Sequence, residues 1–234
     1  MKVSFVIPSY NTAAWLPHAV ESCLDQTHRD IEVVIVDDFS TDSTRQYLAW
    51  LARQKNKRIK IILSEKNRGR SATRNIGNAA ATGDVICVLD SDDLAVNTRA
   101  EWTLKKMKNG KVIYGSAVGM DALGNILKDF PARPVTLGEA IEKGTVGIVH
   151  STMAYTKEIA AKYPYAEGDI CRLGIDDWEM QMRMLHDGVK FDFIPDVISA
   201  YRMLEESITN TRNQEDVDKV KRGIIEGMKL EAVK

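Results

Sequence analysis

The 234-residue sequence has few cysteines, no excess of charge of one sign and no long apolar run. Its three cysteines, Cys23, Cys87 and Cys171, lie far apart. They form no Cys-x-x-Cys pair, so we expect reduced thiols and neither a zinc site nor a redox dithiol of that spacing. A net charge of −1 gives no reason to expect nucleic acid as a partner. No apolar run is long enough to span a bilayer, so we expect no integral membrane segment.

Common nucleotide-binding and metalloprotease motifs are also absent. The sequence has no P-loop ending in Gly-Lys-Ser/Thr, no Gly-x-Gly-x-x-Gly and no His-Glu-x-x-His. Its first residues are interrupted by Pro8 and then turn polar, unlike a secretory signal peptide, so we expect a cytoplasmic protein. An apolar content of 44% and a charged content of 28% are typical of a globular chain with a sizeable core.

The most informative stretch runs from Val85 to Asp93. It begins as an apolar run, typical of a strand buried on both faces, and ends in three carboxylates within four residues. Ligands of open α/β sheets bind at the carboxyl ends of the strands. Asp90 and Asp92 could therefore hold a hard cation such as Mg²⁺ or Mn²⁺ there. The alternative for this stretch alone is a solvated Asp-rich turn.

The first part of the chain alternates short apolar runs with helical periodicity. Asp37 and Asp38 form a second carboxylate cluster at the end of an apolar run. Short βα units of this kind favour right-handed crossovers and a parallel sheet with helices on both faces. We predict a nucleotide-binding half over residues 1–93, with strands at Val3–Ile7, Ile31–Val36, Ile59–Leu63 and from Val85.

The rest of the chain is predicted to form a smaller second half, residues 94–212, and a C-terminal helix within residues 213–234, all in one domain. The last helix is amphipathic with balanced charges, so we expect it to pack against the domain or a second subunit, which leaves a homodimer possible. The other elements predicted here are a helix at Arg99–Lys108, strands at Lys111–Met120 and Ile126–Phe130, a short helix at Val135–Lys143, a strand or loop at Gly144–Met153, a helix from Asp176 to about Gly188, short strands at Phe191–Ile194 and Val197–Tyr201, and the last helix at Glu215–Leu230.

Other charged groups suit an anionic, phosphate-bearing ligand. Arg68, Arg70 and Arg74 cluster where the third strand meets its helix, and guanidinium groups match phosphate oxygens. Taken alone, these arginines could equally form a solvated basic face. Asp176 and Asp177 open a later helix, where acidic residues usually cap. One of them could instead take a proton from an acceptor hydroxyl.

Together these stretches resemble the motifs of family 2 glycosyltransferases with the GT-A fold. The successive motifs are Val3–Asn11, Val36–Asp42, Arg74–Gly77 and Leu89–Asp93. Asp176-Asp177-Trp178 and Arg183 resemble the acidic-Asp-aromatic motif of that family and its following arginine. The resemblance covers Met1 to about Ser207, and its first half is highly specific because four motifs occur in the right order and spacing.

The resemblance implies a role for each matching residue at a nucleotide-sugar site. The loop with Pro8 and Tyr10 would border the nucleotide, Asp38 would bind the nucleobase, commonly uracil, and Arg74 would approach the base or diphosphate, with Arg70 beside it. Asp90-Ser91-Asp92 would be the DXD motif, with Asp90 towards the ribose and Asp92 on the metal.

The resemblance also implies an inverting, metal-dependent hexosyltransferase-type reaction. Asp177 would be the catalytic base, with Asp176 as its nearest rival. The metal, Mn²⁺ or Mg²⁺, would stabilise the leaving nucleoside diphosphate. Members of the family often carry a late Tyr-Arg-x-His pattern, and here Leu204 replaces the histidine of Tyr201-Arg202-Met203-Leu204. His150 and Ser151 lie where the family often has acceptor-side residues, although a buried, satisfied histidine is an equal alternative.

We therefore expect a glycosyltransferase that moves a sugar from a nucleotide diphosphate-sugar, a UDP-sugar, to a glycan or lipid-linked acceptor in polysaccharide biosynthesis. The first alternative is a nucleotide-sugar-binding protein without turnover, which the absent late histidine favours. The second is a sugar-phosphate nucleotidylyltransferase. Such enzymes carry a Gly- and Arg-rich loop after the first strand, and the Pro8-Ser9-Tyr10-Asn11 loop disfavours this reading.

Overall fold

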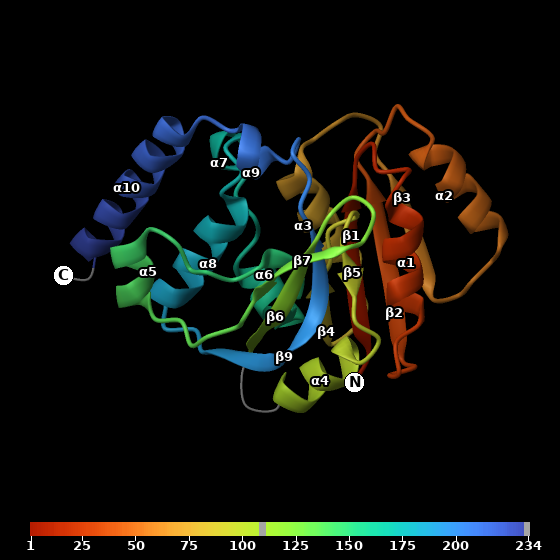
Figure 1. Cartoon of the computed structure of the whole chain (residues 1–234), viewed down its shortest axis with the longest axis horizontal. Coiled ribbons are helices and arrows are strands. Elements are labelled where there is room, and N and C mark those ends of the chain that lie inside the picture. The colour runs from red at the N-terminus through yellow and green to blue at the C-terminus, as the bar shows by residue number, and fades with distance from the viewer. Residues whose placement is uncertain (108–110, 232–234) are drawn as a thin grey trace.

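A computed structural model describes residues 1–107 and 111–231, and Figure 1 shows how their helices and strands lie. The first half alternates as predicted: β1 Val3–Ser9, α1 Leu16–Leu24, β2 Ile31–Asp37, α2 Thr44–Arg53, β3 Ile59–Leu63, α3 Arg70–Ala80 and β4 Val85–Val88. The second half contains β5 Leu94–Ala95, α4 Arg99–Met107, β6 Val112–Met120, β7 Ile126–Phe130, α5 Leu137–Lys143, the 3-10 helix η1 His150–Thr152, β8 Ala154–Thr156, α6 Lys157–Lys162, α7 Asp169–Arg172, α8 Asp176–His186, β9 Phe191–Arg202, α9 Ile208–Thr211 and α10 Gln214–Glu231.

The strands form one sheet in the order β3-β2-β1-β4-β8-β6-β9-β5, with β7 paired to β6. The strands β1 to β4 pair in parallel, and so do β6 and β9. The short strands β5, β7 and β8 pair antiparallel with their neighbours. The predicted class, an α/β fold with a mostly parallel sheet flanked by helices, is confirmed. The parallel order brings the C-terminal ends of β1, β2 and β4 to one edge of the sheet.

Both faces of the sheet are covered by helices. Val3, Phe5 and Ile7 of β1 belong to a core cluster with residues of α1, α2 and α4. Val6 belongs to a second cluster with residues of α6 and α8, against which α3 also packs. This two-sided burial explains why the strands read as continuous apolar runs. Helix α3 lies close to the sheet at Gly77, where an added Cβ would come within 2.4 Å of Val6 Cγ1.

Helix α10 covers the outer side of α8 and α5 (Figure 1, blue). Val217 and Met228 are buried in a third cluster with Trp178 and Leu185 of α8 and Ala140 of α5. The apolar stripe predicted for the last helix therefore packs against the domain itself.

Some elements differ from their predictions. The two strands predicted around Pro195 form one strand, β9, because the pairing with β6 shifts register there and then continues. The segment Gly144–Met153 is a loop that ends in η1. The helix predicted from Arg99 is α4, described as far as Met107, and Lys108 lies outside the described residues. The short elements β5, β8, α6, α7 and α9 were not predicted, because they are too brief to show a periodicity.

The two predictions made from absences can be compared with the described residues. Among the helices of residues 1–107 and 111–231, none is both long enough and apolar enough to cross a bilayer. Cys23, Cys87 and Cys171 are free thiols, and the first two are buried.

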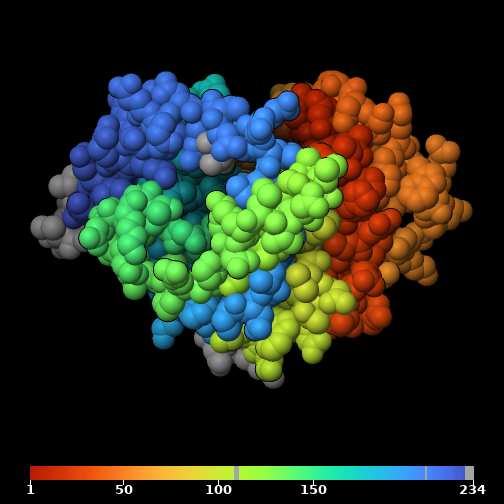
Figure 2. All heavy atoms as spheres, in the orientation of Figure 1, coloured from red at the N-terminus to blue at the C-terminus, as the bar shows by residue number. Residues whose placement is uncertain are grey.

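Figure 2 shows the face on which the hairpin β6–β7 (light green) lies beside α1 (red). The chain between β4 and α4, in yellow-green, lies below them. Residues of α1 and of the turn between β6 and β7 line one cavity at this seam.

Candidate active site

The segments that follow β1, β2 and β4 meet at one edge of the sheet. Ser9 at the end of β1 is paired with Asp37 at the end of β2. Val6 of β1 is paired with Val88, the last residue of β4. The loop after β1, the aspartates after β2 and the run Asp90–Asp93 therefore lie together, as the sequence predicted from parallel pairing.

The three residues predicted to border the nucleotide at this edge differ in exposure. Pro8 is a buried residue of β1, paired with Val36. Ser91 is 6% exposed, whereas Tyr10 is 48% exposed. Of the three, only Tyr10 presents its side chain to solvent, so Pro8 and Ser91 can contribute to a ligand site mainly through the shape of their backbone.

Asp38 is 2% exposed and is bonded to the loop that leads into α3. Its two carboxylate oxygens accept hydrogen bonds from the backbone N–H groups of Arg68, at 2.8 Å, and Gly69, at 2.9 Å. Gly69 has a φ of +85°, which favours glycine. Asp38 therefore fixes the turn from which the arginines of α3 start. Each carboxylate oxygen has a further lone pair for a donor such as a base N–H.

Arg74 joins the two halves of the chain. Its guanidinium group, on a residue only 7% exposed, donates to Asp90 Oδ1 at 2.6 Å and to Asp176 Oδ2 at 2.7 Å. Arg70, one turn earlier on α3, donates to the other oxygen of Asp176 at 2.8 Å. Burial would raise the pKa of Asp90, but the charge of Arg74 outweighs it and holds that pKa well below the usual range. Two arginines of one helix thus connect the end of β4 with the start of α8.

The adjacent aspartates of α8 have different surroundings. Asp176 is 2% exposed, and although burial would raise its pKa, Arg74 and Arg70 lower it. A carboxylate held in two ion pairs is poorly suited to accept a proton. Asp177 is half-buried, and within residues 1–107 and 111–231 its carboxylate makes no hydrogen bond or ion pair. Of the two predicted candidates for the base, Asp177 is therefore the one whose carboxylate is not neutralised by a partner in the described part of the chain.

Tyr201 feels the charge of Asp177 and of the carboxylates after β4. The pKa of Tyr201 is raised to about 12, first by burial and then by the charges of Asp93, Asp90, Asp92 and Asp177. Tyr201 near the end of β9 therefore lies among the acids of both halves. The structure brings the two predicted acidic motifs, which are far apart in sequence, around one space.

Asp92 and Asp93 carry poorly compensated negative charge. Burial, followed by the charge of Asp90, raises the pKa of Asp92 to about 6. Asp93 is fully buried, and its pKa is raised well above the usual value by burial, then by Asp92 and Asp90. One oxygen of Asp93 accepts the backbone N–H of Arg202 at 2.7 Å, and the other has no partner in the described part of the chain. A bound cation would relieve this cost.

A divalent cation fits these residues if the substrate helps to bind it. Within the described ranges, no group of three or more His, Cys, Asp or Glu side chains is arranged to hold a metal ion alone. Mg²⁺, however, is commonly bound by one or two carboxylates together with substrate phosphates and water. Asp92, with its raised pKa, and the nearby Asp90 are the carboxylates suited to such a shared site.

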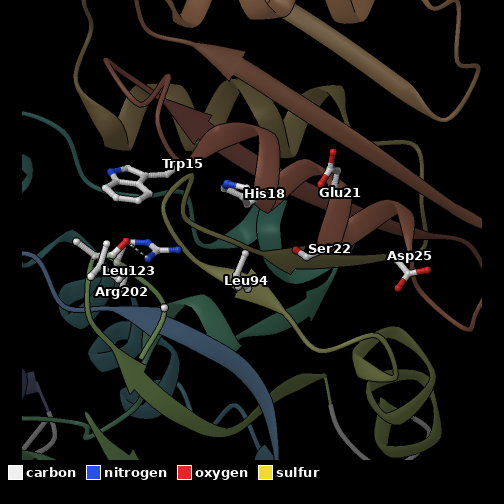
Figure 3. A pocket seen from close by; sticks show the side chains of 10 residues that line it. Trp15, His18, Glu21, Ser22, Asp25, Leu94, Leu123 and Arg202 are labelled. Atoms are coloured by element: carbon white, nitrogen blue, oxygen red, sulfur yellow. Dashed lines mark hydrogen bonds between the residues drawn. The ribbon is translucent and has the colours of Figure 1, made fainter. Parts of the chain in front are cut away.

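A cavity of about 580 Å³ lies between α1 and the turn of the β6–β7 hairpin (Figure 3). Trp15, His18 and Glu21 line its α1 side. Arg202 forms the wall nearest the acids, since its Nε donates to the Asp92 carbonyl oxygen at 2.8 Å and its guanidinium carbon lies 4.4 Å from the centre of the Trp15 ring. The sequence analysis did not predict this cavity. The polar side chains of His18 and Glu21, which lie at helical spacing on α1, were a signal that this face of the helix is not packed in the core.

Comparisons with known proteins show which sequences this chain is similar to. The sequence model described as Glycosyl transferase family 2 matches residues 4–163. The chain is 32% identical over 208 residues to an uncharacterized glycosyltransferase of Methanocaldococcus jannaschii, covering 86% of this chain and 70% of that protein. It is 30% identical over 214 residues to the amylovoran biosynthesis glycosyltransferase AmsB of Erwinia amylovora, covering 86% of this chain and 69% of that one.

The fold is also found among solved structures. A crystal structure of S. aureus TarS, residues 1–349, in complex with UDP-GlcNAc, has a TM-score of 0.73 and 20% sequence identity, covering 91% of this chain and 62% of that one. At this identity the likeness shows the fold alone, which is the GT-A fold. The chain thus spans 62% to 70% of the length of these three proteins, and less than a third of some other curated relatives.

Proposed function

This chain belongs to glycosyltransferase family 2, and on that premise we propose that it transfers a sugar from a nucleotide diphosphate-sugar to an acceptor hydroxyl, with inversion at the anomeric carbon. The observation that carries the proposal is the Arg74 bridge. One guanidinium group binds both Asp90 and Asp176, so the donor-side acids and the acids of α8 belong to one site.

The proposed donor is a UDP-sugar, and the proposed acceptor is a glycan or a lipid-linked glycan in polysaccharide biosynthesis. The complex of TarS with UDP-GlcNAc supports UDP as the nucleotide. The role of AmsB in amylovoran biosynthesis supports a polysaccharide context. Tyr10 and Asp38 border the nucleobase, Asp90 contacts the ribose, and Arg70 and Arg74 keep the carboxylates of this edge in place.

The proposed chemistry is a single displacement. Asp177 takes the proton of the acceptor hydroxyl, and the oxygen forms a bond to the anomeric carbon from the face opposite the diphosphate. The bond from that carbon to the diphosphate oxygen breaks, and its electron pair leaves with the nucleoside diphosphate. Asp92 and Asp90 would hold Mn²⁺ or Mg²⁺, which would supply Lewis-acid stabilisation of the leaving diphosphate. Asp176 stays ion-paired and orients the start of α8.

A second candidate function is a nucleotide-sugar-binding protein without turnover. Leu204, at the position where the family often has a histidine, favours it, because one side chain for metal or diphosphate is then missing. The carboxylate of Asp177 disfavours it, because that carboxylate has no partner within residues 1–107 and 111–231 and a pure binding protein has no need of a free base there.

The two functions are separated by a donor screen that measures release of UDP or GDP from their sugar conjugates, with a glycan panel as acceptors and Mn²⁺ present. We expect acceptor-dependent release by the wild type and its loss in Asp177→Asn. Asp30→Asn, a change at an exposed position, is the matched control and should retain wild-type release. Donor binding with no release across the panel would favour the binding protein.

A further inference from the structure

His150 lies beside the end of β4, in η1, and is 8% exposed. Its Nε2 is 2.9 Å from the hydroxyl oxygen of Tyr165, which is 3.0 Å from that of Tyr155. The Tyr155 hydroxyl accepts a hydrogen bond from the side-chain amide of Asn78 at 3.1 Å. The imidazole stands edge-on to the Tyr165 ring, at 84°. A buried polar chain that begins on α3 therefore fixes the orientation of the His150 ring.

The other ring nitrogen, Nδ1, points at Asp90. It is buried and has no hydrogen-bond partner among the described residues. It lies 3.8 Å from Asp90 Oδ2, whereas Arg74 occupies Oδ1. The next residue, Ser151, holds the same aspartate, since its hydroxyl accepts the Asp90 backbone N–H at 3.2 Å. An unpaired buried nitrogen is costly, and a shift of less than about 1 Å would bring Nδ1 and Oδ2 within hydrogen-bond distance.

Two directions let both hydroxyls accept and donate one hydrogen bond, and they differ at Asn78. In the first, the Asn78 amide donates to the Tyr155 hydroxyl at 3.1 Å, and in the reverse one that hydroxyl donates to Asn78 Oδ1 at 3.4 Å, so the first has the shorter hydrogen bond. In the first direction Asn78 donates to Tyr155, Tyr155 donates to Tyr165, and Tyr165 donates to Nε2 of His150. In that direction the neutral imidazole carries its proton on Nδ1, and its N–H faces Asp90. Hydrogen bonds arranged in series polarise one another, so the last donor of the chain is strengthened.

We propose that His150 is a positioning residue of the donor site, which donates from Nδ1 to Asp90 and, with Arg74, holds that carboxylate in one orientation towards the nucleotide. The inference rests on the proposed function, in which Asp90 contacts the ribose. The side chain of Asp90 is 27% exposed, and those of Arg74 and His150 are each 8% exposed. Asp90 is thus the member of this trio that can reach a ligand, and His150 acts through it.

A pair of amide substitutions separates the two ends of the imidazole. His150→Asn places a side-chain N–H near the position of Nδ1 and loses the contact with Tyr165. His150→Gln places one near Nε2 and loses the group that faces Asp90. With UDP and Mn²⁺ in calorimetry, we expect about a tenfold weaker affinity for His150→Gln and an affinity within about threefold of wild type for His150→Asn. The melting temperatures of both variants serve as the control for folding.

The outcomes decide between positioning and packing. A selective loss in His150→Gln supports the proposal. Wild-type affinity in both variants would overturn it, and so would an equal loss in both that follows their melting temperatures. If the wild type itself binds neither UDP nor GDP, the proposed function fails and this inference fails with it. If the wild type binds and the two variants behave alike, only this inference fails.

A ligand-free measurement tests the contact itself. The ¹⁵N shifts of the His150 ring, assigned by comparison with His150→Gln, should report a proton on Nδ1. Asp90→Ala should change the Nδ1 shift, and Asp25→Ala, an exposed change just after α1, should leave it unchanged. A proton on Nε2 alone, or an Nδ1 shift that Asp90→Ala leaves unaltered, would overturn the proposal.

Discussion

Asp176 and Asp177 are neighbours in sequence, but the structure gives them different tasks. Both were candidates for the base, because a sequence pattern does not show which carboxylate is neutralised by partners from elsewhere in the chain. The partners of Asp176 are Arg70 and Arg74, more than a hundred positions away. The acidic and basic clusters could each be predicted from local sequence, but their pairing could not, because it depends on how α3 and α8 meet.

The first prediction concerns these two aspartates. Asp177→Asn should lower kcat at least about a thousandfold, because removing the base leaves the acceptor hydroxyl without a proton acceptor. It should leave the UDP affinity and the melting temperature close to wild type. Asp176→Asn should instead reduce the free energy of unfolding by about 3 kcal/mol, since it leaves Arg74 and Arg70 with a neutral partner in a buried place. Steady-state kinetics and urea unfolding of both variants measure these effects. A stability loss in Asp177→Asn together with a kcat loss at wild-type stability in Asp176→Asn would contradict the choice of Asp177 as the base.

The second prediction concerns the pH dependence of stability at Asp92. Its pKa is raised to about 6 in the folded protein, against about 3.9 in an unfolded chain. The folded protein therefore binds this proton more tightly, so stability is lost as pH rises from about 4 through about 6. In EDTA, Asp92→Asn should be more stable than wild type by about 1–2 kcal/mol at pH 7.5, and this difference should disappear near pH 4.

Urea unfolding at the two pH values measures the effect of Asp92. Asp25→Asn, an exposed change just after α1, is the control and should show no such pH dependence. A stability difference for Asp92→Asn that is the same at both pH values would mean that Asp92 is not protonated more readily in the folded protein.

Helix α3 is the element that organises the site. It packs on the sheet near Val6 and Val36, and its first turns carry Arg70 and Arg74. The strands below it were predicted well, because burial on both faces makes continuous apolar runs. The division of β9 at Pro195 was wrong, because a proline normally ends pairing and here the register shifts past it.

The third prediction tests the close approach of α3. Gly77→Ala should destabilise the protein by about 1–3 kcal/mol, because the new Cβ would lie 2.4 Å from Val6 Cγ1 and 3.3 Å from Val36 Cγ2. Gly223→Ala on the outer helix α10 is the matched control. Nothing lies within 4 Å of its added Cβ, so it should stabilise by about 0.5–1 kcal/mol. Urea unfolding of both variants measures whether the two changes in the free energy of unfolding have opposite signs. An unchanged free energy of unfolding in Gly77→Ala would show that the space between α3 and the sheet can hold another methyl group.

The whole described chain is built around one sheet. Strand β8 pairs with β4 on one side and with β6 on the other, so the two predicted halves share a continuous hydrogen-bonded layer. Arg74 adds ion pairs across the same boundary. The sequence alone offered little reason to prefer one domain over two. The strand that joins the two halves, β8, has only three residues and is too short to recognise from a sequence pattern.

The fourth prediction follows from this shared sheet. Urea unfolding followed by far-UV circular dichroism and by tryptophan fluorescence should give one coincident transition. The tryptophans report from both halves, since Trp15 and Trp50 lie in the first and Trp102 and Trp178 in the second. Two separated transitions would show that residues 1–93 and the rest unfold as separate units.

The most direct test of the account is calorimetric titration of UDP with and without Mn²⁺, on the wild type and on Asp92→Ala, with Asp25→Ala as the control. The account predicts that UDP binds to the wild type and the control only when Mn²⁺ is present, and that Asp92→Ala loses this binding. Metal-independent binding that survives in Asp92→Ala, or no binding of UDP or GDP under any metal condition, would contradict the donor site described above.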